Sequence, residues 1–470
     1  MSRLVTALSL CFLSQFVFAD DSLFDQKTLG KAATLRDGAL QKNEAYALLE
    51  SLTTEIGPRM AGSPADAKAV AWAEQKFKSL GYDKVTLQPL TFPVWQRGHE
   101  SAEVLSPFPQ RLLITALGGS IGTDGKALDA EVVAFASLDA LKATPENSLN
   151  GKIAFINKRM ERHRDGSGYG LVVAGRGAGA VEAAKKGALA IVIRSVGTDS
   201  DRLPHTGTMR YDIAVKKIPA AALSVPDADL LANMLKRGKP VILRLDIAAG
   251  FTGTYTSHNV IGEIRGREKP NEFVVIGGHL DSWDLGTGAV DDGAGVSITM
   301  AAGALIGQMK QAPRRSIRVI AFANEEQGLY GGKAYAEANK DNVANHQIGA
   351  ESDFGAGRIY EISAGVANNV WPVIEQIGSV LAPLGITAAK GKGGAGPDIG
   401  PIVALGMPWV ELQQDGTDYF DLHHTANDTL DKVDPKALDQ QFAAYAVFAY
   451  LAAESKMDFG TVPRKVEEKK

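Results

Sequence analysis

Histidines and acidic residues gather around one loop in the second half of the chain. In the segment FVVIGGHLDSWDLGTGAVDDGAG, a loop that follows an apolar run holds His279, Asp281, Asp291 and Asp292. A strand that ends in two glycines and delivers such side chains to a loop is typical of open α/β enzymes, whose ligands bind beyond the carboxyl ends of the strands. In a His-x-Asp pair, the imidazole can bind a metal ion while the carboxylate fixes its tautomer. Taken alone, the segment is also explained by ordinary turn chemistry.

Three further segments carry residues of the same kinds. Glu325 and Glu326 follow one apolar run, Asp353 follows another, and His423 and His424 lie in a loop before the last predicted helix. Adjacent carboxylates past a buried strand repel each other unless one is protonated or a cation compensates them. At a solvated helix start, the glutamate pair would need no such explanation. Five His and carboxylate ligands with one shared aspartate suit two zinc ions ~3.5–4 Å apart with a water molecule between them.

The motifs around these residues resemble those of a known family. The stretches GGHLDSWDLGTGAVDDGAG, ANEEQGLYGG, ESDFG and HHTANDT are similar to the four metal-site motifs of the co-catalytic di-zinc aminopeptidases and carboxypeptidases. The flanking stretches EIGPRMAGSPADA, HNVIGEIRG and DPKALDQ also resemble that family, so the likeness covers nearly all of the mature chain. The resemblance implies an exopeptidase with two Zn²⁺ per chain, and it is closest to members that act on dipeptides.

The resemblance also implies a role for individual side chains. Asp291 would be shared by both ions, and Glu325 would be the general base. Asp281 would be the outer partner of a metal-binding histidine, and Asp398, in the glycine-rich stretch 390–401, would shape the pocket or bind the free amine of the substrate. His423 would either donate a hydrogen bond to the developing oxyanion or be a structural neighbour of a ligand. The implied metal ligands are His279, Asp291, Glu326, Asp353 and His424; the rival acids are Asp284, Asp292, Asp415, Asp418 and Asp428.

The strands and helices that must position these residues alternate along the chain. This alternation indicates an α/β fold, with a mostly parallel mixed sheet and helices on both faces. Apolar patterning predicts helices over 64–80, 296–305 and 435–454 and strands over 85–95, 273–276 and 315–323. Short strand-like and helical runs between 130 and 247 resemble a protease-associated domain. We therefore expect a catalytic domain made of residues 44–120 and 250–460, with an inserted αβ domain over 121–249. His163 and His205, inside the insertion, are expected to be solvated loop residues.

Composition and the N-terminus limit the functions that are possible. A formal charge of −4, without a clustered basic face, argues against nucleic-acid binding. Residues 1–19 are typical of a signal peptide, and residues 20–43 would form an N-terminal arm or propeptide. The lone cysteine, Cys11, lies in the signal, so the mature chain has no disulfide. We expect an exported periplasmic or extracellular protein without stable membrane insertion, and the resemblance makes a homodimer plausible.

Hydrolysis of unblocked dipeptides is therefore the leading hypothesis for the function. A broader aminopeptidase that acts on longer peptides is the nearest alternative. A non-catalytic binding protein on the same fold is a third, but such relatives would have lost part of the ligand set, whereas here the proposed ligands and Glu325 are all present.

Overall fold

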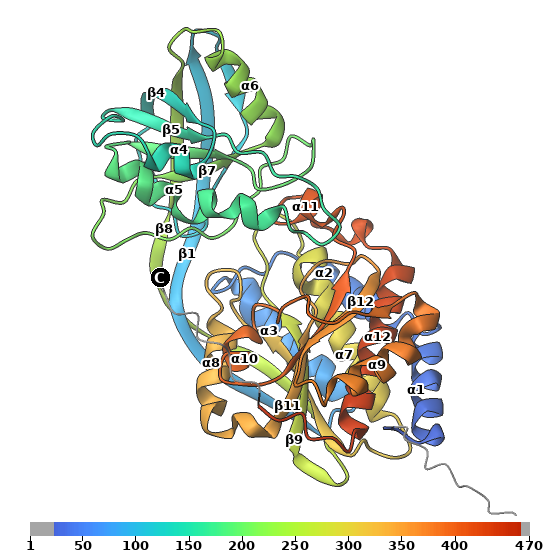
Figure 1. Cartoon of the computed structure of the whole chain (residues 1–470). Coiled ribbons are helices and arrows are strands. Elements are labelled where there is room, and N and C mark those ends of the chain that lie inside the picture. Colours follow the sequence, from blue (N-terminus) through green and yellow to red (C-terminus); the bar gives the residue numbers. More distant parts are fainter. Residues whose placement is uncertain (1–22, 462–470) are drawn as a thin grey trace, which may run out of the picture.

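The computed structural model describes residues 23–461, which form a large lobe and a small lobe (Figure 1). The predicted signal peptide and Cys11 lie outside the described residues. The strands are β1 (Lys84–Ser106), β2 (Gln110–Leu112), β3 (Ile114–Ala116), β4 (Leu128–Phe135), β5 (Lys152–Ile156), β6 (Ala190–Arg194), β7 (Ala220–Leu223), β8 (Ile242–Ile264), β9 (Lys269–His279), β10 (Arg315–Phe322), β11 (His346–Glu351), β12 (Ile359–Gly365), β13 (Thr387–Ala388) and β14 (Trp409–Gln414). The helices are α1 (Gln26–Ala39), α2 (Glu44–Glu55), α3 (Pro64–Ser79), α4 (Leu138–Lys142), α5 (Val173–Lys185), α6 (Val225–Leu235), α7 (Ala294–Gly307), α8 (Tyr330–Asn339), α9 (Trp371–Leu381), α10 (Gly400–Val403), α11 (Tyr419–Leu422) and α12 (Pro435–Glu454).

The sheet of the large lobe is mixed, with parallel strands at its centre. Its order is β13-β12-β14-β11-β9-β10-β8, in which β14, β11, β9 and β10 run parallel while β12 and β8 run antiparallel to their inner neighbours. Because parallel strands end at the same edge of a sheet, the loops after β9, β10 and β11 meet there. The predicted mixed α/β sheet is confirmed.

Helices cover both faces of this sheet, as predicted. Val274 and Ile276 of β9 pack in the cluster that contains α7 and α12, whereas Val275 packs with α8 and α10. Successive strand residues therefore serve opposite faces, which explains the continuous apolar run in the sequence. Within residues 23–461, one helical stretch, 289–307, is long and apolar enough to cross a bilayer, and it is entirely buried inside the protein.

Local sequence signals account for several helix ends. Ser63 caps α3 through its side chain, which accepts a hydrogen bond from the Asp66 N–H, and Pro64 is the first helical residue. α12 spans the predicted range, Pro435–Glu454. α1 lies within the predicted arm or propeptide, and it packs against α12 while burying Ala32 and Leu35.

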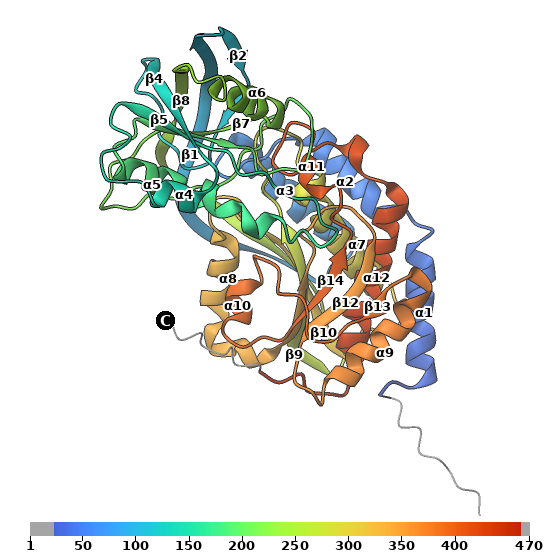
Figure 2. The same cartoon turned by 45° about the horizontal axis from the view of Figure 1, so that its top comes forward.

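Two long strands connect the lobes. β1 and β8 pair antiparallel from Lys84 opposite Glu263 to Ser106 opposite Ile242, with irregular register on either side of Arg97. The ribbon runs from one lobe into the other (Figures 1 and 2). We define the small lobe as residues 97–249 and the large lobe as the remaining described residues. The strand predicted over 85–95 is therefore part of the longer strand β1, and residues 97–120, which were expected in the catalytic domain, lie in the small lobe as defined here.

The small lobe is a second αβ layer. Its strands follow the order β8-β4-β5-β6-β7-β3, with parallel pairing from β4 to β7. Ile156 of β5 packs in a cluster with residues of α4 and α5, while Phe155 packs with residues of α6, so helices cover both faces here too. This lobe lies beside α11 and above the carboxyl edge of the large sheet (Figure 2).

Candidate metal centre

The strand ends bring the predicted ligands together. His279 is the last residue of β9, Glu326 follows β10, and Asp353 follows β11. Asp291 lies in the turn before α7, and His424 follows the short helix α11. Residues that are up to 145 positions apart in sequence thus face one another at one edge of the sheet, and their side chains are almost wholly buried.

Asp291 lies between two pairs of side chains. Its Oδ1 is 3.0 Å from His279 Nε2, and that nitrogen is 3.5 Å from an Asp353 oxygen. Its Oδ2 is 3.2 Å from His424 Nε2, which is 3.1 Å from a Glu326 oxygen. One carboxylate therefore presents an oxygen to each His–acid pair, as expected of a residue shared by two metal sites.

The donor atoms fit metal binding rather than a closed hydrogen-bond network. Glu326 Oε1 is buried and has no hydrogen-bond partner among the described residues, and Asp291 Oδ2 lies 3.2 Å from His424 Nε2 without forming a hydrogen bond. Leaving buried carboxylate oxygens without hydrogen bonds costs free energy unless a cation compensates them. Imidazole nitrogens and carboxylate oxygens at this separation are the ligands that zinc prefers. The structure thus supplies two groups of donors that share Asp291.

Charge at the centre is shared among these groups. Burial lowers the pKa of the His279 imidazole, but the Asp353 and Asp291 carboxylates outweigh burial and hold that pKa well above its usual value. Glu326 and Asp291 likewise outweigh burial and raise the pKa of His424 to about 9. Burial raises the pKa of the Asp353 carboxyl to about 6. The carboxylates around each imidazole thus favour its charged form.

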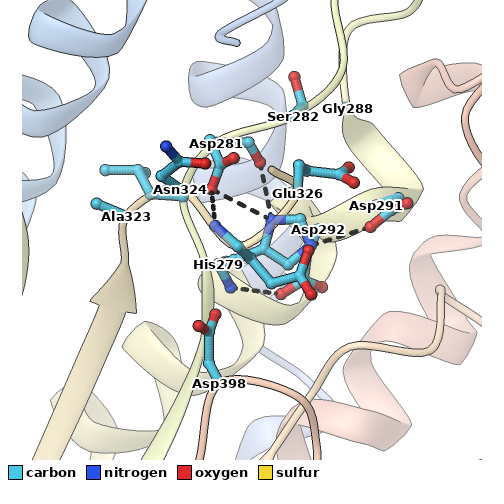
Figure 3. Close-up of polar contacts among 12 residues, drawn as sticks. His279, Asp281, Ser282, Gly288, Asp291, Asp292, Ala323, Asn324, Glu326 and Asp398 are labelled. Carbon is cyan, nitrogen blue, oxygen red and sulfur yellow. Dashed lines mark hydrogen bonds and ion pairs between the residues drawn. The ribbon is translucent and has the colours of Figure 1, made fainter. Parts of the chain in front are cut away.

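Asp281 contacts His279 as predicted, but through a different atom. His279 Nδ1 is 2.9 Å from the main-chain carbonyl of Asp281, whereas the nearest carboxylate oxygen is 3.8 Å away (Figure 3). The Asp281 carboxylate instead accepts the main-chain N–H of Glu325 at 3.0 Å. The carbonyl therefore orients the imidazole, and the carboxylate positions the predicted base.

Glu325 faces a cavity of about 670 Å³ that opens over the donors. Burial raises the pKa of its carboxyl well above the usual range, and the neighbouring Glu326 and Asp353 add to that shift. Both lobes line the cavity, since Arg176 and Thr208 come from the small lobe and Phe354 from the large one. The metal centre thus lies between the lobes.

Comparison with known proteins identifies the chain. The model of peptidase family M28 matches residues 259–449. Carboxypeptidase Q from Bos taurus is 36% identical over 413 residues, covering 88% of this chain and 86% of that protein. The chain belongs to peptidase family M28. It is a metal-dependent exopeptidase, and the resemblance drawn from the four motifs is confirmed.

Solved structures support the same conclusion for the whole fold. A peptidase M28 precursor from Shewanella amazonensis SB2B shares 51% identity and a TM-score of 0.92, covering 94% of this chain and 100% of that chain. An aminopeptidase from Aneurinibacillus sp. strain AM-1 shares 25% identity and a TM-score of 0.65, covering 92% of this chain and 98% of that one. Both lobes of the peptidase are therefore included in these similarities.

His423 and Asp398 occupy different positions relative to the cavity. His423 lines it, stacks on His424 with ring centres 3.5 Å apart, and has a buried Nδ1 without a hydrogen-bond partner among the described residues. Its Nε2 is 3.7 Å from Asp291, so it also belongs to a group of side chains that could hold a metal. Asp398 is fully buried, and it accepts the main-chain N–H of Gly332 at 3.2 Å. Its neighbour Pro397, rather than Asp398, lines the cavity.

The rival acids have other partners. Asp284 pairs with Arg97 at 3.0 Å, Asp415 with Arg164 at 2.9 Å and Asp418 with Arg162 at 2.6 Å.

Asp292 lies close to His279 and Asp353, and in geometry it could join a metal group. Its two oxygens, however, accept the main-chain N–H groups of His279 at 2.9 Å and Gly295 at 3.1 Å. Asp291 is therefore the better ligand of the two.

Two residues support the metal loop in roles that the sequence analysis did not assign: Arg59, which it did not single out, and Asp428, which it named only as a rival acid. Asp428 accepts the main-chain N–H groups of Val290 at 2.6 Å and Asp291 at 3.2 Å, so it holds the shared ligand. The fully buried Arg59 donates to main-chain carbonyls of the same loop, those of Leu280, Thr287 and Gly288. Neither contact has a sequence signal, because the partners are main-chain atoms far away along the chain.

The expectation that His205 is a solvated loop residue is wrong. Its side chain is buried between the lobes, where it contacts Asp199 and the main chain of His423. His163 is half exposed, as expected of a loop residue.

Proposed function

We propose that the protein is a di-zinc exopeptidase that hydrolyses small peptides with free ends, above all dipeptides. One zinc would be held by His279, Asp353 and Asp291, and the other by His424, Glu326 and Asp291. Zinc bound there would polarise the scissile carbonyl and acidify a water molecule. The proposed substrate length is argued from the small-lobe wall of the cavity, which lies opposite the metal ligands.

Arg176 is the observation that carries the substrate proposal. Its side chain lies in the cavity wall and is 7% exposed, yet its Nε and Nη1 have no hydrogen-bond partner among the described residues. Its Nη2 donates to the Tyr169 hydroxyl at 2.5 Å. A buried guanidinium with free donors favours a carboxylate, which it can bind through two parallel charge-assisted hydrogen bonds. We assign the free carboxyl end of the substrate to this side chain.

The position of Arg176 limits the length of peptide beyond the scissile bond. A Cβ placed on Gly207 would be 2.4 Å from Arg176 Nη1 and 2.8 Å from His424 Nδ1, so the guanidinium lies close to a metal ligand. A carboxylate anchored that near to the centre leaves room for a single residue, because one extended residue spans ~3.3–3.6 Å. The bond that reaches the metals is then the last one of the peptide.

The chain's own residues would move the protons. Glu325 would take a proton from the attacking water and pass it to the leaving amine, and its raised pKa suits it to hold that proton between the two steps. The Asp281 carboxylate fixes the main chain of Glu325. His423 would donate a hydrogen bond to the developing oxyanion, which its place in the cavity wall permits. Asp398 would act on the substrate only through the loop that carries Pro397.

The remaining parts of the proposal follow from the sequence. The apolar N-terminus supports export, to the periplasm or the outside medium. The motifs of the small lobe support a protease-associated identity, and the family likeness supports a homodimer. Carboxypeptidase and aminopeptidase relatives both match the chain, so removal of residues from the amino end of longer peptides is the second candidate.

Substrates with blocked ends would test this proposal. We expect rapid hydrolysis of an unblocked dipeptide, and kcat/KM lower by ~10–100-fold for its C-terminal amide, since a hydrogen-bonded charge contributes about 1.5–3 kcal/mol. Arg176→Met should lose the same factor on the dipeptide and little on the amide. Lys185→Met, at the exposed end of the same helix, is the matched control. Equal rates on the dipeptide, its amide and longer peptides would favour the aminopeptidase instead.

A further inference from the structure

One loop of the small lobe reaches the metal ligands of the large lobe. The main-chain N–H of Thr206 donates to the His424 carbonyl at 3.1 Å, and His424 Nδ1 is 3.3 Å from the Thr206 carbonyl. Thr208 donates its hydroxyl to the carbonyl of Glu326. Glu326 and His424, which complete one donor group, are therefore both held by hydrogen bonds with residues 205–208, which we call the ligand loop.

His205 anchors the ligand loop. It is 1% exposed, its Nε2 is 2.8 Å from Asp199 Oδ1, and its Nδ1 is 2.8 Å from the His423 carbonyl. Its main-chain N–H donates to Ser195 Oγ at 2.8 Å. An oxygen acceptor at each end of the imidazole fixes the ring, and through the His423 carbonyl the ring restrains the segment that carries His424.

His424 needs such restraint. Its φ is +62°, in the left-handed region that residues other than glycine rarely adopt. That conformation persists only where the surroundings impose it. Nδ1 of the His424 ring contacts the Thr206 carbonyl, and this contact orients the ring so that Nε2 faces Asp291 and Glu326. Gly207 leaves no spare room, since a Cβ there would be 2.8 Å from His424 Nδ1.

The other donor group does not rely on the small lobe. His279 Nδ1 contacts the Asp281 carbonyl, and the main-chain N–H of His279 donates to Asp292. Asp353 lies two residues past the end of β11 in the central sheet. Among the described residues, no hydrogen bond joins His279 or Asp353 to residues 97–249.

We propose that Asp199 and His205 are positioning residues of the metal centre, and that through the ligand loop the small lobe sets zinc affinity at the Glu326–His424 group alone. This inference rests on the di-zinc centre proposed above. The inserted lobe would then do more than cover the substrate, because one of the two metals would bind tightly only when the lobes are in contact.

Zinc binding by the purified full chain tests this, with free zinc set by a competing chelator. We expect two zinc ions per unmodified chain. In His205→Leu we expect one site to keep its affinity and the other to weaken by ~10–100-fold, the usual effect of losing a residue that orients a ligand. His205→Asn, which can place an amide N–H near the position of the lost Nδ1–H, should recover part of the affinity. Arg162→Gln is the control, because it removes exposed inter-lobe ion pairs to Asp418 and Asp421 without touching a ligand.

Two backgrounds identify the affected site. In Asp353→Ala, which keeps the Glu326–His424 group, adding His205→Leu should abolish most of the remaining zinc binding. In Glu326→Ala, which keeps the His279 group, the same change should have no effect.

The outcomes separate this inference from the proposed function. One zinc or none in the unmodified chain would refute the di-zinc centre itself. Two zinc ions with unchanged affinities in a folded His205→Leu, or equal weakening at both sites, would refute the positioning role while leaving the di-zinc centre intact. If circular dichroism shows that His205→Leu does not fold, Asp199→Asn replaces it, and unchanged zinc affinity there would equally refute the inference.

Discussion

Arg59 offers a sharp test of how the metal loop is held. The guanidinium is fully buried, and it donates to the main-chain carbonyls of Leu280, Thr287 (2.7 Å) and Gly288 (2.8 Å). These carbonyls belong to the loop between His279 and Asp291, so the cation fixes the segment that connects two metal ligands. Arg59→Met keeps much of the side chain's length while removing every donor.

The structure gives the size of the expected effect. Each buried acceptor left without a partner costs about 1–3 kcal/mol. The carbonyls of Leu280 and Gly288 are fully buried and that of Thr287 partly so, which gives a loss of about 3–6 kcal/mol. Arg59 also lies near several acids, so its removal from the metal-free protein leaves their negative charge less compensated; these are Asp281, Asp291, Asp292 and Asp428. We therefore expect a larger loss of stability without zinc than with it.

Thermal unfolding followed by circular dichroism measures this loss. We expect Arg59→Met to lower Tm by roughly 3–7 °C and to weaken zinc binding, and the shift in Tm should be larger when a chelator has removed the zinc. Arg162→Met is the matched control, because Arg162 is 38% exposed and its ion pairs contribute about 0–1 kcal/mol. If Arg59→Met melted within a degree of the unmodified protein and bound zinc normally, the view that this cation holds the loop would be refuted.

Three further predictions concern catalysis, metal and pH. Glu325→Gln should lower kcat by ~10²–10⁴-fold without changing zinc content, as expected for loss of a general base; near-normal turnover would exclude that role. Removal of zinc by a chelator should lower Tm and added zinc should restore it, because a ligand that binds the folded state stabilises it. If Tm were the same with and without chelator, that result would argue against a metal centre. Burial, with help from Arg318, lowers the pKa of His346 to about 4, below its value of about 6.5 in the unfolded chain. Because the pKa is lower in the folded protein, the unfolded chain takes up the proton at a higher pH than the folded one. Neutral His346 therefore contributes its full share of folding stability above about pH 6.5, and this share, about 3 kcal/mol, is lost as the pH falls towards 4. His346→Gln should flatten the pH dependence of unfolding in that window, and an unchanged slope would contradict the assignment.

The amino-acid sequence by itself determined the chemistry of the site. Zinc accepts few kinds of ligand, so the histidines and carboxylates that follow apolar runs stand out, and the likeness of the four motifs reduced them to the predicted ligands, among them His279, Asp291 and His424. It also determined local structure where the signal is local. Ser63 and Pro64 begin a helix because a side-chain cap and a preset φ act within one turn.

Only the tertiary structure decided what holds those ligands in place. Arg59, Asp428 and His205 act on main-chain atoms more than a hundred positions away, and main-chain N–H and C=O groups are present at every residue, so they leave no trace in the sequence. The same limit hid the continuous β1–β8 ribbon, since two strands pair through main-chain groups, and the register shifts on either side of Arg97 interrupt the pairing pattern. In the sequence, polar side chains of the small lobe are indistinguishable from solvated ones, because only the contact between the lobes buries them. Their contact makes His205 part of the metal centre's surroundings.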